Sequence, residues 1–328
     1  MTPKAQIANT AGGRVGPHYP AVLLLALAAL AFAACAGSSA PSGDEPSETV
    51  ARGEGNVFPI PGNNSLAVGH NRFSLMLVDD DDRPILDADV YLRFFDLTGD
   101  EPVLKQEADA QFIAMELYVT DEESDGGKGQ ASYNGTYVTP VDFDTPGRWV
   151  VDVSVTHAGR QLELIPLQLE ILNETPEPAI GDPAPPSRQP TLADVTDIAE
   201  IDSSLTPRTG MHDITIAAAL AAGKPAVVAF ATPAFCENRT CGPLMDTIMD
   251  PLKEKYQEAT FIHIEPYKLD DLRQGVGLIH VKAMEEWNLQ TQPWLFVIDR
   301  NGEIAAKFEG ITARDEVETA LRQALEQG

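Results

Sequence analysis

The segment Asn173–Pro190 divides the chain into two stretches of different sequence pattern. It contains six prolines. Proline fixes φ and lacks a backbone N–H, so a segment this rich in it cannot continue a helix or a central strand. We therefore expect residues 173–190 to be a linker between two domains, 56–172 and 191–328. A chain of 328 residues has room for two domains of ordinary size.

Residues 56–172 contain short runs in which apolar and polar residues alternate, as in half-buried antiparallel strands. Turn-forming sequences such as Thr145-Pro146-Gly147 separate the runs. The expected strands are Phe73–Val78, Asp89–Phe95, Phe112–Val119, Ala131–Val138, Arg148–Val155 and Gln161–Ile171. Strands of this number and length predict an all-β domain built as a two-sheet sandwich.

After residue 190 the pattern changes to alternating helices and strands. The expected helices are Ile214–Ala222, Pro243–Gln257, His280–Asn288 and Thr312–Gln327; the expected strands are Pro225–Ala231, Ala259–Glu265, Trp294–Asp299 and Glu303–Phe308. Asn301-Gly302, between the last two strands, is a strong hairpin signal. The order β-α-β-α-β-β-α after a leading helix predicts an α/β domain that closes with a hairpin and a helix.

Three motifs in this α/β domain resemble those of the thioredoxin-like, or redoxin, superfamily. Ile180–Pro185 resembles the beginning of redoxin domains, Pro225–Cys236 resembles their central strand and active cysteine, and Gln292–Gly302 resembles their cis-proline strand and hairpin. The resemblance covers residues 178–328 and implies a thioredoxin fold. It also implies that Pro293 is in the cis form and faces the redox cysteines.

Two stretches of the β-rich domain, Arg83–Val90 and Gly135–Val153, resemble small extracytoplasmic immunoglobulin-like domains of the FixH and YtkA type. The resemblance implies an immunoglobulin-like sandwich at the N-terminal side of the redoxin-like domain. Fold alone does not define a function, so the ligand of such a sandwich stays open. We expect it to act as a spacer or a docking module.

Cys236 and Cys241 lie where the expected central strand meets the following helix. Backbone N–H groups and the helix dipole favour a thiolate there, and the thiolate is the form that attacks a disulfide. Four residues separate the cysteines, which is short enough to bring their Cα atoms within the ~4.4–6.8 Å that a disulfide requires. We expect Cys236 to be the nucleophile and Cys241 the resolving thiol of a thiol–disulfide oxidoreductase. Its partners would be protein or small-molecule thiols and disulfides, and we expect no cofactor and no metal ion.

Some positions depart from the thioredoxin pattern, in which two residues separate the cysteines and a buried Asp stands at the place of Ala229. His263 and Glu265, at the end of a neighbouring strand, could replace that carboxylate. The cysteine spacing also resembles Q-type peroxiredoxins, but Pro233 and Gln292 stand where those proteins carry an activating Thr and Arg. Two alternatives stay open: a copper metallochaperone of the Sco type, and a catalytically silent binding lipoprotein with a structural disulfide.

An apolar run, Ala21–Ala34, precedes Cys35 near the N-terminus. It is too short to cross a membrane as a helix, which takes roughly 20 residues, and it fits the apolar region of a signal peptide. The sequence around Cys35 resembles a bacterial lipobox, which implies that residues 1–34 are removed and that Cys35 is lipidated. We therefore expect a chain anchored by lipid to the extracytoplasmic face of the cell membrane, with residues 35–55 as a disordered tether. An uncleaved signal anchor is the alternative.

The charge of the chain bears on its partners. The formal net charge is −27 at pH 7. Nucleic acid binding depends on neutralising phosphates with Lys and Arg, so we expect no nucleic-acid partner.

Overall fold

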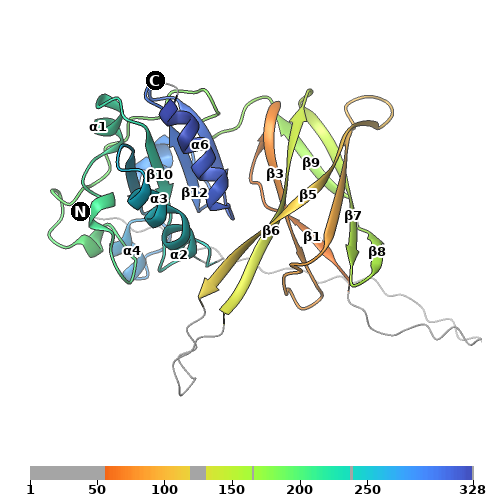
Figure 1. Cartoon of the computed structure of the whole chain (residues 1–328), viewed down its shortest axis with the longest axis horizontal. Coiled ribbons are helices and arrows are strands. Elements are labelled where there is room, and N and C mark those ends of the chain that lie inside the picture. Colours follow the sequence, from red (N-terminus) through yellow and green to blue (C-terminus); the bar gives the residue numbers. More distant parts are fainter. Residues whose placement is uncertain (1–55, 119–130, 165, 237–238, 327–328) are drawn as a thin grey trace, which may run out of the picture. The chain divides into compact units, whose positions relative to one another are not determined.

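The computed structural model of the chain describes residues 56–118, 131–164, 166–236 and 239–326 (Figure 1). The signal peptide and tether predicted at 1–34 and 35–55, and Cys35 with them, lie outside these residues. No helix in the described ranges is long and apolar enough to cross a membrane. The contacts divide the chain after Arg52, and the remainder of the chain forms one compact unit.

The first sheet occupies the N-terminal part of this unit. Its strands are β1 (Phe58–Pro61), β2 (Leu66–Ala67), β3 (Gly69–Val78), β4 (Asp89–Asp96), β5 (Val103–Tyr118), β6 (Ala131–Phe143), β7 (Gly147–His157), β8 (Arg160–Glu163) and β9 (Leu167–Leu172). They lie in the order β1-β3-β6-β5-β4-β7-β9-β2, and β8 pairs with β7. Only β2 and β9 run parallel among these described pairs; the other neighbours are antiparallel.

The sequence predicted two separate sheets, but the nine strands form one continuous sheet. The two parts of this sheet are connected because β5 pairs with a strand of each. Residues Gln111–Tyr118 of β5 pair with β6, and residues Val103–Ala110 pair with β4. The strand expected at Gln161–Ile171 is also two strands, β8 and β9, because Pro166 lies between them and cannot donate to a ladder.

The two halves of the first sheet share one core. Alternate side chains of β3, β4, β6, β7 and β9 point into it, as the period of two of a strand requires. Four of its aromatic rings form a chain of edge-to-face contacts from Phe73 through Phe94 and Phe143 to Trp149, with ring centroids 4.9–6.1 Å apart. Burial of each such side chain stabilises the fold by about 1.5–3 kcal/mol.

The second sheet is mixed and lies in the C-terminal part of the unit. Its strands are β10 (Ala226–Phe230), β11 (Thr260–Ile264), β12 (Trp294–Ile298) and β13 (Ile304–Glu309), in the order β11-β10-β12-β13. β10 and β11 are parallel, whereas β12 is antiparallel to both β10 and β13. The predicted order of strands along the chain is therefore confirmed.

Helices accompany the second sheet in the predicted order. They are α1 (Ile216–Ala221), α2 (Cys241–Leu244), α3 (Asp250–Lys255), α4 (Leu269–Arg273), α5 (Lys282–Glu286) and α6 (Arg314–Glu326). The π-helical stretch Met245–Met249 joins α2 to α3, so that residues 241–255 form one continuous helical segment. The sequence pattern did not predict α4.

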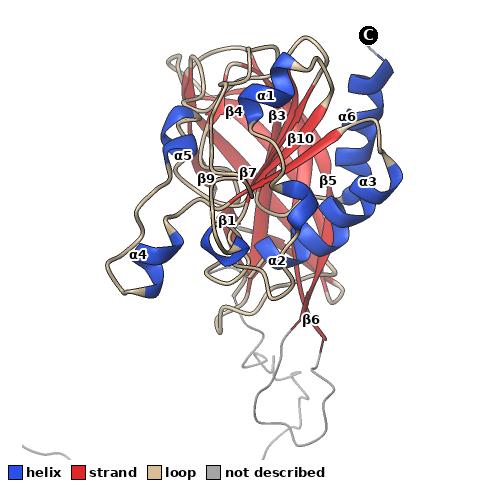
Figure 2. Ribbon diagram, turned by 90° about the vertical axis from the view of Figure 1, so that its left-hand side faces the viewer, coloured by secondary structure: helices blue, strands red, loops and turns tan. Residues whose placement is uncertain are grey.

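Both faces of the second sheet are covered (Figure 2). Val227 and Ala229 of β10 pack in one core with side chains of the 241–255 segment and α6, while Val228 and Phe230 pack in another with side chains of α1 and α5. All five residues of β10 are buried as a result. This burial holds the end of β10, from which the chain continues to Cys236, in a fixed place.

Part of the predicted linker packs against the second sheet. The N–H of Gly181 donates to the carbonyl of Ile304, and the N–H of Ile304 donates to the carbonyl of Asp182. A bridge between Pro183 and Glu303 continues this contact. Residues 181–184 are therefore ordered along the hairpin, and the assignment of residues 173–190 as a domain boundary stays a prediction.

Candidate functional site

The candidate site begins where β10 ends. The N–H of Ala231 donates to the carbonyl of Ile264, which extends the parallel pairing by one residue. The chain then turns, with the N–H of Phe235 donating to the carbonyl of Thr232, and reaches Cys236. Cys236 thus lies at the carboxyl end of a buried central strand, where the sequence pattern placed it.

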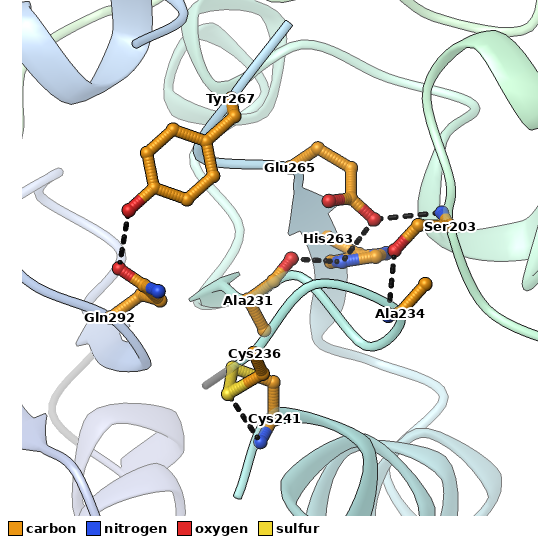
Figure 3. The surroundings of a disulfide bond; sticks show 9 residues. All are labelled: Ser203, Ala231, Ala234, Cys236, Cys241, His263, Glu265, Tyr267 and Gln292. Carbon is orange, nitrogen blue, oxygen red and sulfur yellow. Dashed lines mark hydrogen bonds and ion pairs between the residues drawn. A yellow bond between two sulfur atoms is a disulfide. The ribbon is translucent and has the colours of Figure 1, made fainter. Parts of the chain in front are cut away.

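Cys236 and Cys241 are joined by a disulfide, with Cα atoms 6.0 Å apart (Figure 3). Cys241 is completely buried and Cys236 is partly buried. Cys241 is the first residue of the 241–255 helical segment, and its N–H donates to Sγ of Cys236 across 3.3 Å. This donor and the helix dipole favour negative charge on the Cys236 sulfur. The predicted disulfide is confirmed; the separate roles of the two sulfur atoms stay predictions.

The loop between the cysteines closes through Arg239. Its N–H donates to the carbonyl of Cys236 across 3.0 Å, and its φ of 58° lies in the left-handed region. The turn sends the chain back, so that Cys241 begins the helical segment beside Cys236. Residues 237 and 238 lie outside the described ranges.

The peptide bond between Gln292 and Pro293 is cis, as the redoxin resemblance implied. In the register of the second sheet, Trp294 pairs with Phe230. Pro293 therefore lies at the same end of the sheet as the turn that leads to Cys236. Gln292 is held by the hydroxyl of Tyr267, which donates to its Oε1 across 2.9 Å (Figure 3). That Pro293 faces the disulfide stays a prediction.

His263 and Glu265 lie beside the loop, as the sequence suggested, and both are buried. Nε2 of His263 is 2.9 Å from the carbonyl oxygen of Ala231. Oε1 of Glu265 accepts from the N–H of Ser203, and the N–H of Ala234 donates to the Ser203 hydroxyl (Figure 3). These contacts reach the backbone of Ala231 and Ala234, which precede Cys236 in the turn.

The sequence pattern did not indicate Asp202 and His212, which lie close to His263. The ligand atoms of these three buried side chains lie within 4.8 Å of one another. Asp202 and His212 come from a stretch whose only described helices are the 3₁₀ turns Ile198–Glu200 and Thr209–Met211. Such a stretch has no periodicity that could have placed them, and His263 is far away in sequence. Only the tertiary fold brings the three together.

The carboxylates and imidazoles of this region influence one another. Burial raises the pKa of Glu265, and the nearby His263 and the hydrogen bond from Ser203 offset only part of that rise. Burial alone would lower the pKa of His263, but the neighbouring Asp202 and Glu265 outweigh it and raise the pKa. Burial would likewise raise the pKa of Asp202, but its contacts with His212 and His263 outweigh that effect and hold the pKa below its usual range.

Replacing Glu265 with glutamine should change how stability depends on pH. The raised pKa means that the unfolded chain loses this proton first, so wild-type stability falls as pH rises from about 4.3 through the folded-state pKa. Glutamine does not titrate. The free energy of unfolding of Glu265→Gln minus that of the wild type should therefore increase with pH across that window, as measured by urea denaturation at successive pH values. A difference independent of pH would contradict the raised pKa of this buried carboxyl.

The sequence matches no family model, and no curated protein matches it. Among solved structures it is similar to a putative thiol:disulfide interchange protein DsbE from Chlorobium tepidum, with 16% identity, a TM-score of 0.30, and coverage of 45% of this chain and 99% of that chain. It is also similar to a thiol:disulfide interchange protein of the thioredoxin family from Chlorobium tepidum TLS, with 18% identity, a TM-score of 0.25, and coverage of 42% of this chain and 99% of that chain. The function of this chain is therefore inferred from its own cysteines and their surroundings.

Proposed function

We propose that this chain is a thiol–disulfide oxidoreductase that acts through Cys236 and Cys241. The observation that carries the proposal is the N–H of Cys241, at the start of a helical segment, directed at Sγ of Cys236 from 3.3 Å. A donor at this place stabilises the thiolate that forms when the disulfide is reduced. It therefore makes Cys236 both a better leaving group and a thiol that is ionised at lower pH.

The difference in burial between the two cysteines supports the proposed order of action, because the partly buried Cys236 is the more accessible of the two. In the reduced protein, the Cys236 thiolate attacks a partner disulfide; a bond forms between the two proteins, and the other partner sulfur leaves as a thiolate and takes up a proton. The buried Cys241 then loses its proton and attacks Sγ of Cys236. This second step restores the internal disulfide and releases the partner as a dithiol, so that two electrons have passed to the partner.

The topology of the second sheet and the cis-proline before β12 support a thioredoxin-fold domain over residues 191–328. Its central parallel pair β10 and β11, the antiparallel hairpin β12 and β13, and the cis-proline before β12 agree with the motifs of the redoxin resemblance. A structural disulfide is the principal alternative. A copper site of the Sco type, which would use both cysteines as ligands in their reduced form, is the second alternative.

The remaining parts of the proposal concern location. We place the protein on the extracytoplasmic face of the cell membrane, anchored by lipid at Cys35, with residues 35–55 as the tether. The apolar run Ala21–Ala34 and the small residues before Cys35 support this assignment. The first sheet would then be an immunoglobulin-like spacer or docking module between the anchor and the redox domain.

The reduction potential of the Cys236–Cys241 couple tests the catalytic role. A Cys35→Ser variant removes the third cysteine of the chain, and equilibration in redox buffers followed by alkylation of free thiols gives the oxidised fraction. We expect a potential between about −120 and −270 mV, the range of known thiol–disulfide catalysts. A potential below about −300 mV, typical of structural disulfides, would contradict the proposal.

A further inference from the structure

Asp202, His212 and His263 present three potential ligand atoms to one point in the interior. Oδ2 of Asp202 is 3.2 Å from Nε2 of His212 and 3.8 Å from Nδ1 of His263. A zinc ion with ligands at about 2.0–2.2 Å in tetrahedral geometry separates them by roughly 3.4 Å. The three side chains are at most 3% exposed. Their spacing thus fits a small metal ion with little movement.

One ring nitrogen of His263, Nδ1, is buried without a hydrogen bond to the described residues. A carbonyl can only accept, so Nε2, 2.9 Å from the carbonyl of Ala231, carries a proton. In neutral His263 the lone pair of Nδ1 faces the Asp202 carboxylate, and in charged His263 the Nδ1 proton pairs with that carboxylate across 3.8 Å, which is longer than a hydrogen bond. A cation between Nδ1 and the carboxylate satisfies both groups.

The backbone already orients the ligands, as it does in metal sites. The bond from Nε2 of His263 to a carbonyl is the contact that metal-binding histidines typically make with their second nitrogen. The Asp202 carboxylate accepts from the N–H of Ser204 at Oδ1 and from the N–H of Arg208 at Oδ2, both across 2.8 Å. These bonds fix the carboxylate while leaving lone pairs for a metal ion.

A cavity gives access to the cluster. Its volume is about 430 Å³, and His212, His263 and Glu265 are among the residues that line it. Oε2 of Glu265 is buried without a hydrogen-bond partner in the described part of the chain. Zinc sites with three protein ligands complete their coordination with water or a small ligand, and the cavity beside His212 and His263 is a place from which one could come.

We propose that Asp202, His212 and His263 bind a divalent transition-metal ion, of which Zn²⁺ best matches two imidazoles and one carboxylate. The ion takes the place of any proton on Nε2 of His212 and on Nδ1 of His263, and those protons pass to the solvent, while Nε2 of His263 keeps its proton. The site is separate from the cysteines and does not depend on the proposed redox function. Nothing in the sequence pattern indicated it, because its residues come from an irregular segment and a distant strand.

Zinc binding to the whole chain tests the proposal. A Cys35→Ser chain with the Cys236–Cys241 disulfide intact has no free thiol, so cysteine cannot account for any binding. Competition with a chromophoric chelator should give one high-affinity Zn²⁺ per chain. We expect Asp202→Asn, His212→Gln and His263→Gln each to weaken this binding by at least about 100-fold. His70→Gln, which changes an exposed histidine of β3, is the matched control and should bind as the parent does.

A second measurement on the unsubstituted ligands keeps the test decisive if a variant fails to fold. In ¹⁵N-labelled protein, added Zn²⁺ should shift the Nδ1 resonance of His263 and the Nε2 resonance of His212, while Nε2 of His263 keeps its proton. Absence of stoichiometric binding, unchanged imidazole resonances at saturating Zn²⁺, or equal loss of binding in His70→Gln would overturn the proposal. The reduction potential is measured without added metal, so failure of one proposal leaves the other standing.

Discussion

A Cys236→Ser chain will catalyse thiol–disulfide exchange no faster than buffer alone, whereas a Cys241→Ser chain will capture its substrate as a stable mixed disulfide. Serine cannot replace the attacking thiolate, because its hydroxyl stays protonated at neutral pH. Removal of Cys241 leaves the attacking sulfur in place, still next to the N–H of residue 241. The first step then proceeds and the second cannot.

Reduction of insulin and of a fluorescent glutathione disulfide measures these activities, and electrophoresis without reductant detects the trapped partner. Cys35→Ser serves as the control for loss of a cysteine elsewhere and should retain the activity of the parent. The double variant Cys236→Ser/Cys241→Ser should trap nothing. An active Cys236→Ser chain, or a Cys241→Ser chain that forms no adduct with any disulfide substrate, would rule out the assigned roles.

Trp287→Ala should lower the free energy of unfolding by about 3–5 kcal/mol, the range for truncating a large buried aromatic side chain. Trp287 is fully buried after α5, with its ring centroid 4.7 Å from that of Phe296 and 5.3 Å from that of Phe230. Its Nε1–H also donates to the hydroxyl of Ser187 across 3.2 Å. The truncation thus removes packing against two strands of the second sheet and leaves the hydroxyl without a donor.

Urea denaturation monitored by circular dichroism gives this change in stability. Leu205→Ala is the matched control, since Leu205 is fully exposed and its truncation should change the free energy of unfolding by less than about 0.5 kcal/mol. A loss below about 1 kcal/mol in Trp287→Ala would mean that the core of the second sheet does not depend on this ring.

The elements around the second sheet could be predicted because each is marked locally. The apolar run before Cys236, the Asn301-Gly302 turn and the amphipathic last helix each carry their own signal. In contrast, only the second half of β5 was expected. Its first half, Val103–Ala110, is largely exposed and contains several charged and polar residues. Backbone pairing with β4 makes it a strand, and such pairing leaves no apolar pattern in the sequence.

In the candidate site, too, the residues marked by local sequence could be predicted and those brought together by the tertiary fold could not. Cys236 and Cys241 are close in sequence, so their spacing and the flanking strand and helix were enough to predict the disulfide. The cis bond before Pro293 came from the redoxin resemblance. Asp202 and His212 could not be found, because their proximity to His263 depends on how an irregular segment packs against β11. His263 was expected within an apolar strand, where nothing in the sequence indicated the carboxylate opposite its Nδ1.

The double membership of β5 has a consequence for how the first sheet resists opening. One half of the strand forms its backbone hydrogen bonds with β6, and the other half forms them with β4. If either neighbour peels away, β5 loses half of its backbone partners and the common core is exposed to water. A state in which only half of the first sheet is open should therefore be unstable. The backbone amide protons of this sheet should exchange with solvent as one cooperative unit.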